Sequence, residues 1–77
     1  MFEKSKLKRG IKQRQQKILM LEQKRSRSQA ALVTAILTST TPEDEDVDFF
    51  NRYTAQIEEA RNEMHELKNK LEKLESK

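Results

Sequence analysis

The sequence predicts an all-α protein, an antiparallel hairpin of two long helices, from three observations. Between Phe50 and Leu74 the apolar residues follow steps that alternate between three and four, the a/d pattern of a helix that buries a narrow stripe against another helix. The 77-residue chain contains one Gly and one Pro, so it has little material for tight turns. The proline lies near the middle of the chain, after a run of hydroxyl residues. A single short connection there makes the two helices antiparallel neighbours.

The first helix is expected at about residues 4–38. Its stripe has the same alternation but is weaker, because some of the positions are polar; the stripe consists of Leu7, Ile11, Arg14, Ile18, Leu21, Arg25, Ser28, Leu32 and Ala35. Gly10 lies inside the pattern, and glycine costs about 1 kcal/mol relative to alanine in a helix interior. We therefore expect the first ten residues to fray.

The turn is expected at about residues 39–42 and the second helix at about residues 42–75. Thr41 suits the N-cap, Pro42 suits the first helical position, and Asp44 follows the cap by three residues, as in a capping box. Residues 43–48 are almost all acidic, and the helix dipole favours negative charge in the first turns of a helix. These features predict a helix that begins at the proline.

The seam between the helices is predicted to contain Ile11, Ile18, Leu21, Leu32, Ala35, Phe50, Tyr53, Ile57, Ala60, Met64, Leu67, Leu71 and Leu74. Folding the chain about residues 42 and 43 predicts these facing pairs: Leu32–Tyr53, Ala35–Phe50, Ser28–Ile57, Arg25–Ala60, Leu21–Met64, Ile18–Leu67, Arg14–Leu71 and Ile11–Leu74. The two arginines are expected to lay their stems on the seam with their charged ends in water. A domain-swapped pair of long helices is the alternative, because a short hinge permits both.

A two-helix seam leaves apolar side chains without a partner. The residues concerned, a candidate partner or dimer face, are Leu19, Met20, Val33, Ile36, Leu37 and Phe49. One interpretation is a homodimer that closes into a four-helix bundle, and the other is a binding face for a different protein. The sequence therefore predicts a non-catalytic protein–protein interaction module, such as a small adaptor, assembly factor, chaperone or inhibitor.

Charge is strongly segregated along the chain. Residues 1–41 carry ten Lys and Arg against two Glu, a net charge of +8, whereas residues 42–77 carry six against eleven, a net charge of −5. The candidate phosphate-contacting side chains are Lys4, Lys6, Lys8, Arg9, Lys12 and Lys17. They favour an alternative function, a basic helical-hairpin dimer that binds RNA or DNA. Stacking on single strands is not predicted, because Phe2 is the only aromatic residue of the first helix.

No pattern indicates catalysis, a metal site or a cofactor. The chain has no Cys, its one histidine, His65, falls on the solvent side of the second helix, and no Gly-rich phosphate loop occurs. The Glu-rich stretch around Glu58 and Glu66 is typical of a solvated helix face. Apolar runs are far shorter than the roughly 20 residues of a membrane span, and none suits a signal peptide. We expect a cytoplasmic protein without a membrane role, although the basic start also fits a mitochondrial presequence.

Overall fold

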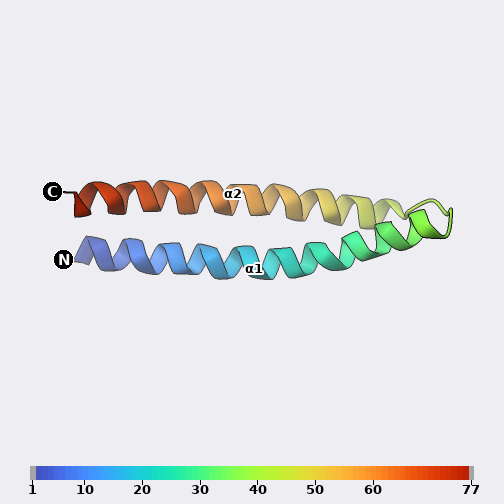
Figure 1. The fold of residues 1–77 in the computed structure, drawn as a ribbon, viewed down its shortest axis with the longest axis horizontal. Coiled ribbons are helices and arrows are strands. Elements are labelled where there is room, and N and C mark those ends of the chain that lie inside the picture. Colours follow the sequence, from blue (N-terminus) through green and yellow to red (C-terminus); the bar gives the residue numbers. More distant parts are fainter. Residues whose placement is uncertain (1, 77) are drawn as a thin grey trace.

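The protein is a helical hairpin. The computed structural model describes residues 2–76, which form α1 (Phe2–Leu37) and α2 (Asp44–Glu75) with a connection over residues 38–43. The two helices lie side by side and antiparallel, so both ends of the chain are at the same end of the molecule (Figure 1). The hairpin measures 58 × 16 × 14 Å. Its radius of gyration is 17.3 Å, whereas a compact domain of this length has about 11–12 Å.

Gly10 is a place of close contact between the helices. α1 is continuous through it and includes residues 2–10 of the segment that was expected to fray, whereas Met1 lies outside the described residues. A Cβ atom built on Gly10 would lie 3.1 Å from Cδ1 of Leu67 on α2. The missing side chain therefore gives room to that leucine, which explains why a poor helix former stands inside a long helix.

α1 ends in a left-handed turn at Ser39, whose φ is 56°. The backbone N–H of Thr40 donates to the carbonyl of Ala35 at 2.8 Å, and the N–H of Ser39 donates to the carbonyl of Ile36 at 3.2 Å. This pair of bonds is the Schellman ending of a helix, in which glycine is the usual left-handed residue. The ending satisfies carbonyls that the last turn would otherwise leave without partners.

α2 begins two residues later than predicted. Its N-cap is Glu43, with φ −68° and ψ 141°, and no side chain makes the capping hydrogen bond. The predicted N-cap at Thr41 and helical start at Pro42 are therefore wrong. Thr40 is still bonded to the end of α1, so the chain needs the following residues to reverse its direction before a new helix can start.

The core lies near the middle of the hairpin. Ile18 and Leu21 of α1 and Ile57 and Ala60 of α2 form one buried cluster. Tyr53 and Met64 pack against this cluster, and Ser28 and Ala35 are buried nearer the turn. The remaining seam residues are half-buried; they are Ile11, Leu32, Phe50, Tyr53, Met64, Leu67, Leu71 and Leu74.

The register of the two helices differs from the prediction by about one heptad. Leu67 lies beside Gly10 and not beside Ile18. Nη1 of Arg25 donates to Oγ1 of Thr54 at 3.4 Å, nearly two turns from its predicted neighbour on α2. The predicted pairs Ile18–Leu67, Arg14–Leu71 and Arg25–Ala60 are therefore wrong. The turn also lies earlier than predicted, because its centre is nearer residues 40 and 41 than residues 42 and 43.

Candidate interaction surface

The side of α1 that faces away from α2 carries most of the exposed large apolar side chains. Leu37 is 79% exposed and Ile36 is 71% exposed. The exposed set on this helix comprises Phe2, Leu19, Met20, Val33, Ile36 and Leu37, and we call these residues the outer apolar face. Residues 28–42 contain no charged residue, so the last turns of α1 have no charged side chain to cover them.

Phe49 lies apart from the outer apolar face. It is half-buried on α2, and its ring stacks on that of Tyr53 with centroids 6.0 Å apart and planes 15° apart. The guanidinium of Arg52 sits over the Phe49 ring, 5.7 Å from its centroid. Because Tyr53 and Arg52 already contact the Phe49 ring, Phe49 offers less free apolar surface than the sequence pattern indicates.

The sequence pattern did not predict the exposure of two apolar residues, Phe2 and Val47. Phe2 lies at the start of the region that was expected to fray. A signal for it exists in the sequence, because Phe2 and Leu37 are a whole number of heptads apart and so lie on one line along α1. Val47 lies in the acidic first turns of α2, where a single apolar residue gives no periodic signal.

The hairpin exposes more surface than a compact protein of its mass. Its solvent-accessible area is 6331 Å². A compact monomer of 9.1 kDa exposes about 4,900 Å². The surplus of roughly 1,400 Å² arises because two helices share only one seam and leave three sides of each helix open.

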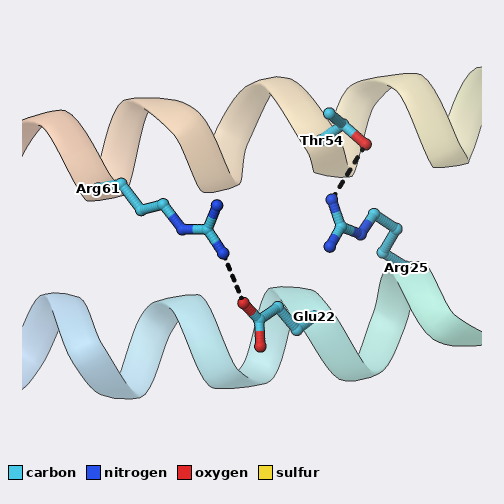
Figure 2. Close-up of polar contacts among 4 residues, drawn as sticks. All are labelled: Glu22, Arg25, Thr54 and Arg61. Carbon is cyan, nitrogen blue, oxygen red and sulfur yellow. Dashed lines mark hydrogen bonds and ion pairs between the residues drawn. The ribbon is translucent and has the colours of Figure 1, made fainter.

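Polar contacts across the seam hold the two helices in register. Nη2 of Arg61 donates to Oε1 of Glu22 at 3.0 Å, and Arg25 reaches from α1 to Thr54 on α2 (Figure 2). The Arg25 guanidinium also lies 5.9 Å from the centroid of the Phe50 ring. The Glu22–Arg61 pair is solvent-exposed, so it contributes at most about 1 kcal/mol to stability.

Arg14 behaves like Arg25 and uses its charged end within the hairpin. Its Nε donates to Oε2 of Glu63 at 3.2 Å, and both side chains are about one-third exposed. The two seam arginines were expected to point into water. Each instead finds a partner on α2, Glu63 for Arg14 and Thr54 for Arg25. These polar positions therefore contribute to the choice of register.

The open end of the hairpin is basic. The predicted phosphate-contacting residues Lys4, Lys6, Lys8, Arg9, Lys12 and Lys17 are all exposed on α1. Within residues 2–76, none of these six side chains forms an ion pair. A shallow groove at this end is lined by Glu3, Lys6, Leu7, Lys70, Lys73 and Leu74. The opposite end, at the turn, carries the acidic residues of positions 43–48.

The described residues were compared with two kinds of site, a metal-binding group and a membrane-spanning helix. Over residues 2–76, no group of three or more His, Cys, Asp and Glu side chains is placed to hold a metal ion. His65 is exposed on α2. Neither of the described helices is both long enough and apolar enough to cross a membrane.

No protein-family model, curated protein or solved structure matches this chain. The fold and the surface define its class, a helical hairpin with an open apolar face on α1 and a separate basic end.

Proposed function

We propose that the chain is a non-catalytic protein–protein interaction module that works through the outer apolar face of α1. The observation that carries the proposal is the exposure of Leu19, Met20, Val33, Ile36 and Leu37 on a helix whose other side is already packed against α2. Exposed apolar patches of this kind are typical of binding surfaces, because water solvates them poorly. A small adaptor, an assembly factor, a chaperone or an inhibitor would each use such a face.

The proposal includes the association of two hairpins into a four-helix bundle with coiled-coil-like seams. The alternation of three and four in both helices supports the coiled-coil-like seam within each hairpin, since helices with this spacing pack side by side at small angles. The surplus surface supports it too, because a second pair of helices would cover sides that one seam leaves open.

Charge reversal at the outer apolar face tests the proposed function. The tagged chain and its Leu37→Glu variant are used to capture proteins from an extract of the organism that encodes the chain. Leu37 makes no contribution to the buried core, so the variant is expected to keep its helical circular dichroism and to lose at least tenfold of specifically captured protein, about 1.4 kcal/mol.

The matched control for this capture is Asn62→Glu, which adds the same charge at an exposed position of α2. It is expected to capture as the wild type does. Equal capture by wild type and Leu37→Glu, with helicity unchanged in both, would show that the outer apolar face is not the binding surface.

A second candidate function is the binding of RNA or DNA by the basic open end. The observation that favours it is the exposure of six basic side chains of α1 without ion-pair partners in the described chain. Clustered lysines and arginines attract phosphates and release the counterions that surround a nucleic acid. Such binding needs no base-reading motif, but it depends strongly on salt.

Neutralisation of Lys8, Arg9 and Lys12 tests this second function. We expect the triple variant to bind a labelled duplex more weakly in fluorescence anisotropy, and the slope of log K against log salt to fall by roughly 0.9 for each phosphate that the variant no longer neutralises. The control is Lys24→Gln with Arg27→Gln, two exposed positions near the middle of α1. Absence of binding at low salt would remove nucleic acid as a ligand, and an unchanged slope in the triple variant would show that Lys8, Arg9 and Lys12 do not contact its phosphates.

A further inference from the structure

We infer that the nucleic acid that the chain binds is duplex DNA, and that residues 4–17 of α1 lie lengthwise in its major groove. We call these residues the basic segment; they belong to a helix whose other side is packed against α2. This inference rests on the second candidate function and names both its ligand and the surface that makes the contact.

The exposed side chains of the basic segment suit a nucleic acid. Between residues 8 and 17 every exposed residue is Lys, Arg or Gln; these residues are Lys8, Arg9, Lys12, Gln13, Gln15, Gln16 and Lys17. The whole basic segment contains no Asp or Glu. Lysine and arginine bind phosphates, arginine also pairs with guanine, and glutamine pairs with adenine. Such a surface can therefore contact both the phosphates and the base edges of a duplex.

The middle of this surface carries residues of the base-pairing kind. Arg9 precedes the seam residue Ile11 by two positions, and Gln16 stands in the same relation to Ile18. Two positions turn a helix by rather more than half a turn, so Arg9 and Gln16 both lie on the side opposite α2. We call the line through these two residues the central line. They are seven positions apart, about 10 Å along the helix, which corresponds to about three base pairs.

Lysines flank the central line on both sides. At about 100° per residue, Lys8 and Lys12 turn to one side of it, and Lys6 and Lys17 turn to the other. All four lysines are exposed. A helix in the major groove has a phosphate backbone on each side and base edges in front of it. The order lysine, arginine or glutamine, lysine across the basic segment matches this arrangement.

The charge of the neighbouring helix decides which side of the hairpin a polyanion approaches. The contact between Gly10 and Leu67 places residues 60–73 of α2 alongside the basic segment. The basic segment carries seven Lys and Arg without any Asp or Glu, whereas residues 60–73 carry four against three. The field of the hairpin therefore draws a polyanion to α1 and not to α2. In Figure 1, α2 lies along one side of α1 only, so it does not block this approach.

Duplex DNA fits the basic segment better than the other nucleic acids do. The major groove of B-DNA is about 12 Å wide, and an α-helix with its side chains is about 10–12 Å across. The major groove of duplex RNA is deep and too narrow for side chains to read. Single strands are bound by stacking on aromatic side chains, and Phe2 is the only aromatic residue of α1.

A comparison of three labelled duplexes of one sequence tests the inference by fluorescence anisotropy at low salt. The first is DNA, the second is DNA in which glucosylated 5-hydroxymethylcytosine replaces cytosine, and the third is RNA. The glucosyl groups fill the major groove and leave the phosphate charge unchanged. We expect the glucosylated DNA and the RNA to bind about tenfold more weakly than the unmodified DNA, or weaker still, because neither admits the helix to its major groove.

Gln16→Glu tests the orientation of the basic segment, because it places a carboxylate on the central line. The matched control is Asn69→Glu, which adds the same charge at an exposed position of α2 alongside the basic segment. We expect Gln16→Glu to bind unmodified DNA about tenfold more weakly than the wild type, and Asn69→Glu to stay within about twofold of it. Both variants are expected to keep their helical circular dichroism, since both positions are exposed.

Equal affinity for unmodified and glucosylated DNA, tighter binding of the RNA duplex, or equal losses in Gln16→Glu and Asn69→Glu would overturn the inference. The binding of nucleic acid by the basic open end would still stand in each of these cases. Binding to none of the three duplexes would overturn both the inference and the second candidate function, and would leave an acidic protein as the ligand of the basic segment.

Discussion

Replacement of Ile57 by alanine is expected to lower the free energy of unfolding by about 2–4 kcal/mol, the cost of a cavity left by a truncated aliphatic side chain. Ile57 is 1% exposed and, among the described residues, is the largest side chain that is completely buried. It belongs to a cluster of only four buried residues, so few neighbours can move to fill the space. A domain of this length has a total stability of about 4–12 kcal/mol. The loss is therefore a large part of the whole.

Urea denaturation, monitored by circular dichroism at fixed protein concentration, measures this change in the free energy of unfolding. Ile57→Val provides the graded control, since loss of one methylene costs about 0.5–1.5 kcal/mol. If Ile57→Ala and Ile57→Val both left the midpoint unchanged, the buried cluster around Ile57 would not be the core of the hairpin.

Replacement of Ala60 by leucine is expected to lower the free energy of unfolding by about 1–3 kcal/mol through overpacking. Ala60 is 1% exposed in the same cluster, where Ile18 and Leu21 approach from α1. A leucine there has no free volume and must push the helices apart or leave its preferred rotamer. Leucine is nearly as good a helix former as alanine, so helix propensity contributes little to the result.

Ala55→Leu is the matched control, because Ala55 is exposed on the same helix. We expect this substitution to change the unfolding free energy by no more than about 0.5 kcal/mol. A similar destabilisation by both substitutions would show that α2 does not present Ala60 to α1.

The fold was predictable from residue spacing, and the hairpin of two helices is confirmed. The register was not predictable, for a physical reason. A slide of one heptad brings a new set of a and d residues into facing layers, so spacing alone does not distinguish the two arrangements. Specific contacts decide between them, such as the space that Gly10 leaves for Leu67 and the reach of Arg14 to Glu63.

The turn was mispredicted because two local signals compete. Thr41, Pro42 and Asp44 form a plausible helix start, whereas the end of α1 uses Ser39 in the left-handed conformation. Serine is a weak signal for that conformation, which glycine usually adopts. The hydrogen bonds of the Schellman ending determine where α1 stops, and the start of α2 follows from that position.

The exposure of the outer apolar residues was predictable where periodicity is strong. Leu19, Met20 and Val33 fall outside the seam spacing, and all three are exposed. Phe49 also falls outside the spacing, but stacking on Tyr53 half-buries it. Contacts between side chains of one helix surface depend on rotamers, which hydrophobic spacing does not encode.

The proposed association of two hairpins implies a defined mass in solution. Size-exclusion chromatography with light scattering, at moderate and at high salt, measures that mass. We expect twice the 9.1 kDa of one chain at both salts, because apolar burial is not weakened by ionic screening. A mass of 9.1 kDa at both salts, at protein concentrations well above the micromolar range, would contradict the pairing.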